Sequence, residues 1–234
     1  MESILSAGIV LVAVIIILYA YSKKKIDLTA IVATGIMGLM IIFTIEIDYL
    51  LVMISFFVLG NLVTKYKYKV KEEQGVAEGV RTFKNVFGNG ASATIFALFY
   101  FLTKDPWLQF AFVGAMATAT ADTFATEIGQ AHEKNPKLIT NFKIVKIGTP
   151  GAVSYYGIFG ALIGAFLLSL VPWLLGNGMV FLIYGTIAGF IGCFVDSFIG
   201  ATIERNMIDK HMTNFLATLA GGIFAIGLFL FFPQ

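Results

Sequence analysis

Residues 151–201 read GAVSYYGIFGALIGAFLLSLVPWLLGNGMVFLIYGTIAGFIGCFVDSFIGA, and Asp196 is the only charged residue among them. The stretch holds two apolar runs, about 151–173 and 178–201, which a short Gly-Asn-Gly turn separates. A helix needs roughly 20 predominantly apolar residues to cross a bilayer. Both runs reach that length, so this stretch predicts two transmembrane helices joined by a tight turn.

Six further apolar runs extend the pattern to the rest of the chain: about 4–22, 26–45, 49–65, 89–103, 107–128 and 213–232. The 234 residues are 58% hydrophobic and 13% charged, against about 25% charged in a soluble domain. The expected fold is an all-α integral membrane bundle of about eight transmembrane helices. We treat residues 1–234 as a single transmembrane domain, with an N-terminal three-helix part (1–65) and a part that bears the sequence motifs (66–234).

The basic residues predict how this bundle is oriented. If the loop after the first span is cytoplasmic, the loops on that side hold 15 of the 16 Lys and Arg residues: Lys23, Lys24, Lys25, Lys65, Lys67, Lys69, Lys71, Arg81, Lys84, Lys134, Lys137, Lys143, Lys146, Arg205 and Lys210. Only Lys104 remains outside. Short cytoplasmic loops are enriched in Lys and Arg, so both termini are expected outside, and the net charge of +2 is too small to indicate nucleic-acid binding.

Charged groups within spans are costly and usually functional, and Asp122, Glu127 and Asp196 are the acidic residues that qualify here. Asp122 and Glu127 belong to the fifth span and Asp196 to the seventh, with the two Asp at matching depth near the inner ends. Facing carboxylates repel unless a cation or a proton lies between them. Carboxylates that leave room for water and phosphate suit Mg²⁺. We therefore predict a magnesium site at Asp122, Glu127 and Asp196; the alternative is that each Asp hydrogen-bonds a neighbouring helix.

The segment EGVRTFKNVFGNG (78–90) precedes the fourth span. Its apolar residues recur at helical spacing from Val76 to Phe87, which predicts an amphipathic helix on the inner surface. Arg81, Asn85 and Asn89 recur every four residues on another face and present hydrogen-bond donors suited to phosphate oxygens. A basic interfacial helix that binds only anionic lipid headgroups would carry the same pattern.

The segment KIVKIGTPGAVS (143–154) leads into the sixth span. Gly148, Thr149 and Gly151 come just before a helix N-terminus, where free N–H groups and the helix dipole favour anions. Lys143 and Lys146 add positive charge upstream. A Gly-Pro sequence that merely breaks a helix is the alternative. Within the spans, small residues predict close helix packing at Gly157, Gly160, Gly164, Gly185 and Gly189.

Five motifs in order resemble the integral membrane family that includes the phytyl-phosphate kinase of vitamin E salvage. They are R-x-x-x-N-V-x-x-N-G from Arg81, A-D-T-x-A-T-E-x-G from Ala121, P-G-A-V-S from Pro150, D-S-x-x-G-A from Asp196 and N-F-L-A-T-L-x-G from Asn214. The chain is more distantly similar to dolichol kinase and the membrane CTP-dependent cytidylyltransferases. Asn85 stands where many relatives have Gln, which keeps an amide; the first three spans carry no signature.

The resemblance implies phosphoryl transfer from CTP, or another nucleoside triphosphate, to a prenyl monophosphate such as phytyl or geranylgeranyl phosphate, with Mg²⁺ as cofactor. It implies metal binding by Asp122, Glu127 and Asp196 and catalytic roles for Asp122, Asp196 and Arg81. The residues expected to contact phosphates, nucleotide or metal are Asn85, Asn89, Lys143, Gly148, Thr149, Gly151, Ser154, Ser197 and Asn214.

Two other functions remain open on the sequence. A CTP:lipid-phosphate cytidylyltransferase would use the same nucleotide and metal, and an ion-coupled transporter would also place carboxylates inside spans. A transporter site is expected near the midplane, whereas these acids lie toward one side. The exact prenyl tail, the nucleotide preference and the oligomeric state are not fixed by the sequence.

Overall fold

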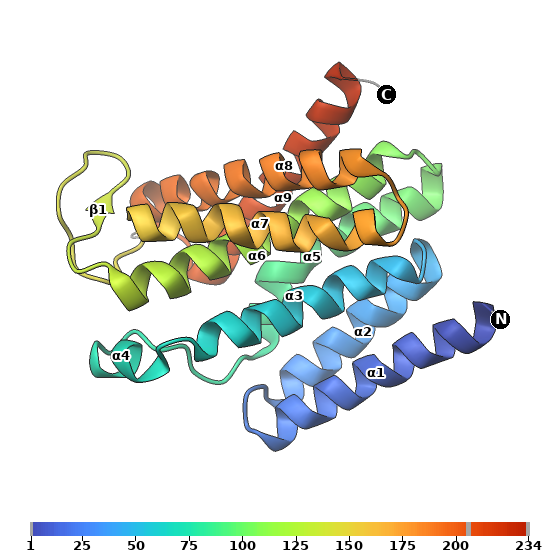
Figure 1. The fold of residues 1–234 in the computed structure, drawn as a ribbon, viewed down its shortest axis with the longest axis horizontal. Helices are drawn as coiled ribbons and strands as arrows, with labels where there is room; N and C mark the ends of the chain where they lie inside the picture. The colour runs from blue at the N-terminus through green and yellow to red at the C-terminus, as the bar shows by residue number, and fades with distance from the viewer. Residues whose placement is uncertain (1, 205–206, 233–234) are drawn as a thin grey trace.

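The computed structural model describes residues 2–204 and 207–232. Over these residues the chain forms α1 (Glu2–Ser22), α2 (Leu28–Thr44), α3 (Asp48–Lys65), α4 (Tyr68–Glu73), α5 (Phe83–Thr103), α6 (Trp107–His132), β1 (Lys137–Leu138), β2 (Ala152–Val153), α7 (Tyr155–Leu174), α8 (Met179–Ile199), the π-helical turn η1 (Gly200–Glu204) and α9 (Lys210–Phe231). Figure 1 shows α1, α2 and α3 on one side of the molecule and α6 to α9 on the other.

A long helix lies at each of the eight predicted spans, which confirms the all-α fold class. Among the described residues, five helical stretches are long and apolar enough to cross a membrane: α3, α5, α7, α8 with η1, and α9. The apolar stretches Ser6–Ser22 of α1 and Leu28–Thr44 of α2 are shorter, and α6 is not one of the five. Eight crossings therefore stay a prediction.

Helix α6 is the central helix of the bundle and packs against α3, α5, α7, α8 and α9. Its residues from Phe110 to Ala121 are all buried. Because protein rather than lipid surrounds this helix, it tolerates Thr and Ala where a lipid-facing helix carries Leu and Phe. Three of its threonines satisfy their hydroxyl groups internally, since Thr118, Thr120 and Thr123 donate to backbone carbonyls one turn earlier.

The predicted glycine packing faces are confirmed on α7 and α8. A Cβ added at Gly160 or Gly164 would lie 2.8 Å from a carbonyl oxygen of α6, and one at Gly189 would lie 2.7 Å from Ala117. A Cβ at Gly185 would lie 2.5 Å from Ser169 Oγ. Such separations are too short for carbon, so these helices approach one another only because the side chains are absent.

The predicted amphipathic helix on the inner surface is wrong for residues 76–82, which are not helical. Arg81 N–H donates to the Lys25 carbonyl and Asp27 N–H donates to the Arg81 carbonyl, each at 3.0 Å, so the segment pairs with the α1–α2 connection. Helix α5 then begins at Phe83, because Thr82 and Asn85 form a capping box there. This start lies six residues before the predicted fourth span (89–103).

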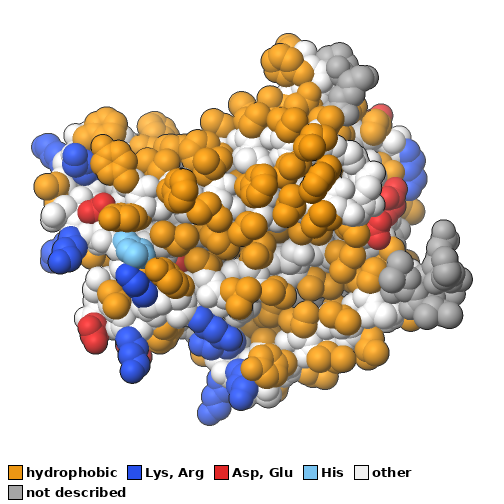
Figure 2. Space-filling view, viewed as in Figure 1, with side chains coloured by type: hydrophobic (Ala, Val, Ile, Leu, Met, Phe, Trp, Pro, Cys, Tyr) orange, Lys and Arg blue, Asp and Glu red, His pale blue; other side chains and the backbone are white. Residues whose placement is uncertain are grey.

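Most Lys and Arg side chains gather at one end of the molecule. In Figure 2, which has the orientation of Figure 1, most of them lie at the end that carries α4 and β1, hydrophobic side chains cover the middle, and a few charged side chains lie at the opposite end. Arg205, which belongs to the predicted inner set, lies outside the described residues. The polar site described next lies at this basic end.

Candidate functional site

A cavity of about 140 Å³ lies between the ends of α6, α7 and α8 and the loop that precedes α7. Four elements far apart in sequence contribute to it: Asp122 from α6, Gly148–Ser154 from the loop, Asp196 and Ser197 from α8, and Lys210 from the start of α9. Seven residues predicted to act in the site therefore line one cavity: Asp122, Gly148, Thr149, Gly151, Ser154, Asp196 and Ser197.

Asp122 and Asp196 come from adjacent helices, α6 and α8, and line this cavity together. Asp196 Oδ2 is buried and has no hydrogen-bond partner among the described residues. A buried carboxylate oxygen without a partner is costly. The ammonium group of Lys210 lies within electrostatic reach of both acids. The pair is thus built to receive a positively charged or hydrogen-bonding group.

The glycine loop closes the cavity from the side of α7. Gly148 and Gly151 have φ angles of 81° and 74°, in the left-handed region that favours glycine. A Cβ on Gly151 would overlap Ala201 of η1, so the loop lies directly on the end of α8. The N–H groups of Gly148 and Gly151 make no backbone hydrogen bond within the described residues. They are therefore available to an anion.

The N-terminus of α7 faces the same cavity. Ser154 is its N-cap, and the Ser154 hydroxyl oxygen accepts a hydrogen bond from Gly157 N at 3.0 Å. Ser154, Gly157 and Ile158 all line the cavity, so the positive end of the helix dipole contributes there. The loop amides, the helix dipole and Lys210 together favour a phosphate group.

A magnesium ion fits the two aspartates. Among the described residues, no three His, Cys, Asp or Glu side chains are arranged to hold a metal ion. Mg²⁺ does not need three, because it is commonly held by one or two carboxylates and completes its octahedral shell with water and substrate phosphates. The unpartnered Asp196 Oδ2 supplies the free carboxylate oxygen that such a site requires.

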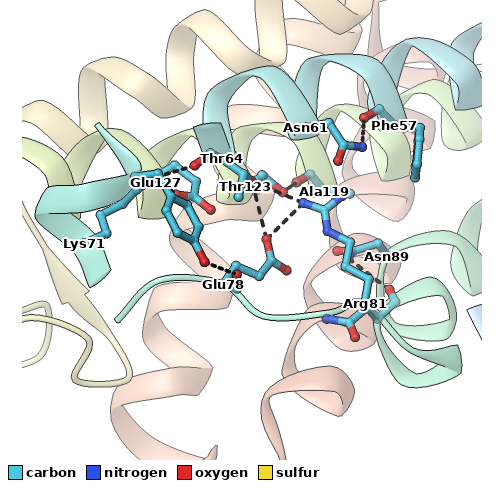
Figure 3. A network of polar contacts seen from close by, with 12 residues as sticks. Phe57, Asn61, Thr64, Lys71, Glu78, Arg81, Asn89, Ala119, Thr123 and Glu127 are labelled. Atoms are coloured by element: carbon cyan, nitrogen blue, oxygen red, sulfur yellow. Dashed lines mark hydrogen bonds and ion pairs between the residues drawn. The ribbon is translucent and has the colours of Figure 1, made fainter. Parts of the chain in front are cut away.

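Glu127 lies elsewhere. It follows Asp122 by five residues, which turns it about 140° around the helix axis. Its carboxylate forms a buried ion pair with Lys71 of α4, and the Lys71 ammonium also donates to the Thr64 carbonyl at 2.8 Å. Figure 3 shows Lys71 and Glu127 meeting away from Arg81. Glu127 therefore fastens α4 to the bundle and does not line the cavity.

Arg81 belongs to a second polar cluster, which Figure 3 shows beside α3 and α6. Its Nη2 donates to Glu78 Oε2 at 3.0 Å and to Thr64 Oγ1 at 3.3 Å. Burial acts to raise the pKa of Glu78, but the charge and hydrogen bond of Arg81, the charge of Lys210 and the hydrogen bond from Thr64 hold it below its usual value. Glu78 therefore lies within electrostatic reach of both Arg81 and Lys210 and connects the two clusters.

The three asparagines mainly support the helix ends. Asn85 Oδ1 accepts from Thr82 N at 2.9 Å in the capping box, and Asn89 Nδ2 donates to the Asn85 carbonyl at 3.0 Å. Asn214 Nδ2 donates to Asn89 Oδ1 at 3.1 Å, which ties α9 to α5. Asn214 Oδ1 is buried without a partner in the described part of the chain.

Lys143 lies on the exposed loop between β1 and β2 and does not line the cavity. The structure instead brings Glu78, Lys210 and Glu204 to the acids. Glu78 was missed because its partners Arg81, Thr64 and Lys210 lie on three different segments. Lys210 offered a usable signal, since it stands immediately before an apolar run on the side where the acids lie.

The chain matches the family described as "Integral membrane protein DUF92" over residues 11–225 and therefore belongs to it. It is 31% identical to an uncharacterized membrane protein of Methanocaldococcus jannaschii over 218 residues, which cover 93% of this chain and 91% of that protein. An uncharacterized membrane protein of Synechocystis sp. is 33% identical over 189 residues, 76% of this chain and 72% of the other. "Protein VTE6, chloroplastic" of Arabidopsis thaliana is 37% identical over 135 residues, 54% of this chain and 40% of that protein. No solved structure matches the chain at a significant level.

Proposed function

We propose that the protein is a prenyl-phosphate kinase, which transfers the γ-phosphoryl group of CTP or another nucleoside triphosphate to a prenyl monophosphate. The observation that carries the proposal is the cavity that Asp122 and Asp196 line together with the loop Gly148–Ser154, where Asp196 Oδ2 is buried without a partner among the described residues. The resemblance of the five motifs to the phytyl-phosphate kinase family and the match to VTE6 support the choice of substrate.

Phosphoryl transfer requires positioning of the reactants and neutralisation of their charge rather than a strong base. An oxygen of the acceptor monophosphate attacks the γ-phosphorus, the bond from that phosphorus to the β–γ bridging oxygen breaks, and the nucleoside diphosphate leaves with the electron pair. The acceptor oxygen is already anionic, so no proton has to be removed from it.

We assign the binding of the metal ion, the donor phosphates and the acceptor phosphate to different residues. Asp122 and Asp196 would hold Mg²⁺, which, when bound, neutralises charge on the triphosphate. The amides of Gly148 and Gly151, the N-terminus of α7 and Lys210 would hold the donor phosphates. Arg81, on the far side of Glu78, would hold the acceptor phosphate. The basic end of the molecule, and the site with it, would face the cytoplasm.

Product analysis with purified protein tests the proposal. The protein in nanodiscs is incubated with Mg²⁺, geranylgeranyl or phytyl monophosphate and each nucleoside triphosphate, and products are identified by mass spectrometry. A kinase yields prenyl diphosphate and nucleoside diphosphate. A CDP-linked lipid with pyrophosphate would instead indicate the cytidylyl transfer of the distantly similar enzymes. No turnover with any lipid phosphate would contradict both enzymatic functions and leave the transporter.

A further inference from the structure

A second and larger cavity, of about 260 Å³, lies between α1, α2, α3 and α5. Apolar side chains form nearly all of its wall, among them Val14, Ile17, Ile42, Met53 and Phe57, with Met116 of α6 at its base. On α2 the lining residues run from Thr34 to Ile42, eight residue steps or about 12 Å along the helix axis. We call this cavity the apolar groove.

One end of the apolar groove is polar. Arg81, Asn85 and Asn89 line it there, and the backbone of Arg81 is held by hydrogen bonds to Lys25 and Asp27 on either side of the α1–α2 connection. The two hydrogen bonds that the guanidinium makes to described side chains both come from Nη2. An Arg side chain has five N–H donors, so Nη1 and Nε remain for a ligand.

The polar end of the groove lies beside α3 and α6. A Cβ added at Gly60 would lie 3.6 Å from Arg81 Nη1 and 3.8 Å from Thr123 Cγ2, and Thr123 is the neighbour of Asp122 in α6. Glu78 then links Arg81 to Lys210, which lines the catalytic cavity. A phosphate on Arg81 would therefore lie at the polar end of the groove, beside Glu78, which is within electrostatic reach of Lys210.

Glycines create the width of the groove. Gly35 and Gly38 of α2 line it; a Cβ added at Gly35 would meet nothing within 4 Å, and one at Gly38 would meet only Leu50 Cδ1, at 3.7 Å. These glycines are not needed for helix contact, unlike those of α7 and α8. The space they leave is apolar and continuous with the Arg81 end.

We propose that the apolar groove holds the hydrocarbon tail of the lipid monophosphate acceptor, with its phosphate on Arg81. The proposal rests on the proposed function and names the place of its substrate. The apolar groove suits a hydrocarbon chain, and the Arg81 guanidinium suits a phosphate. Together they favour a single-tailed amphiphile with an anionic head. A prenyl monophosphate has that form.

The test fills the groove and leaves Asp122, Asp196 and Arg81 unchanged. Gly35→Leu places an isobutyl group in the open space, and Gly227→Leu makes the same change at a glycine of α9 that also meets nothing within 4 Å but lies outside the groove. We expect Gly35→Leu to lower kcat/KM for geranylgeranyl monophosphate about tenfold or more and to lower it less for the shorter geranyl monophosphate. Gly227→Leu should match wild type with both.

Equal losses for both acceptors, or no loss, in a Gly35→Leu protein that keeps its melting temperature would overturn the proposal while leaving the kinase function intact. If Gly35→Leu fails to fold, Gly38→Leu serves as the second variant.

A binding assay without nucleotide tests the role of the groove independently of the reaction. Radiolabelled geranylgeranyl monophosphate should bind wild-type protein without nucleotide and should bind Gly35→Leu more weakly. It should resist displacement by excess phosphatidic acid. Binding that Gly35→Leu leaves unchanged, or that phosphatidic acid displaces equally well, would assign the groove to a bilayer lipid and contradict the proposal even if turnover were absent.

Discussion

Gly192 of α8 and Gly35 of α2 both lie in apolar helices, yet their surroundings differ. A Cβ at Gly192 would overlap the Thr118 side chain of α6, whereas a Cβ at Gly35 would meet nothing. The contrast extends to the two sides of the molecule. In α6 to α9 small residues bring helices into contact around the half-buried Asp122 and Asp196, and in α2 they keep space open beside α1, α3 and α5.

The difference shows how one residue type serves two functions in a membrane bundle. Close contact fixes the positions of Asp122 and Asp196, which a metal site requires to be rigid. Open space beside α2 gives a groove that a flexible tail can fill. The two proposals therefore assign the chemistry and the substrate tail to different sides of the molecule, with Arg81 at the polar end of the groove.

Removing a single aspartate should have the largest effect. We expect Asp122→Asn and Asp196→Asn each to lower kcat by at least about 100-fold, because each loses charge at the transferring phosphoryl group. The melting temperature should hold, since neither side chain anchors a helix through an ion pair with a described residue. Asp105→Asn, in the loop before α6, is the matched control. Near wild-type rates in both site variants would refute the metal assignment.

Breaking the buried ion pair between Lys71 and Glu127 should lower the stability of the protein rather than its catalytic rate. Lys71→Met leaves Glu127 buried without its partner, and a broken buried pair costs about 3–5 kcal/mol. Denaturant unfolding in detergent measures this loss. The double variant Lys71→Met/Glu127→Leu should recover much of it, because no charge then remains buried. If the single variant were as stable as wild type, the pair would not fasten α4.

The contrast between Gly192 and Gly35 predicts smaller changes in stability, of opposite sign for the two glycines. Gly192→Ala should destabilise by about 1–3 kcal/mol, because the added methyl group overpacks the contact with α6. Gly35→Ala should be neutral or stabilise by about 0.5–1 kcal/mol, since alanine favours a helix and finds open space. Melting temperatures in one detergent compare the two. Equal losses would erase the distinction between contact glycines and groove glycines.

The smallest predicted effect is a pH dependence that belongs to Glu78. Its pKa is lowered from the ordinary value of 4.5 in the folded protein. An acid whose pKa is lower in the folded protein than in the unfolded chain stabilises the fold at pH values above its unfolded pKa. This stabilisation is lost as the pH falls through its folded-state pKa. Stability should therefore decline below about pH 4.5, and Glu78→Gln should flatten that decline. An unchanged acid profile in Glu78→Gln would show that the link between Arg81 and Lys210 contributes nothing there.

Apolar run length predicted the long helices well, because lipid imposes both length and composition on a span. The start of α5 was missed because the capping box of Thr82 and Asn85 is a local polar signal inside an apparently amphipathic pattern. The matching depth of Asp122 and Asp196 predicted that they face one another, and both line the same cavity. Glu127 was grouped with them by closeness in sequence, although its five-residue offset from Asp122 turns it to another face.

The apolar groove could not be predicted, because it depends on which helices become neighbours. Gly35 and Gly160 look alike in the sequence, as glycines within apolar helices. Only tertiary structure shows that Gly160 touches α6 and that Gly35 faces open space. The Lys71–Glu127 pair is similar, since its members are 56 residues apart.

Photoaffinity mapping tests the division between tail and chemistry most directly. A geranylgeranyl monophosphate that carries a diazirine at the far end of its tail is bound to the protein and irradiated, and the labelled peptides are sequenced. The account predicts labels on the groove-lining residues of α1, α2 and α3, such as Val14, Leu39 and Ile42, and their loss in Gly35→Leu. Labels confined to α7, α8 and α9 would contradict it.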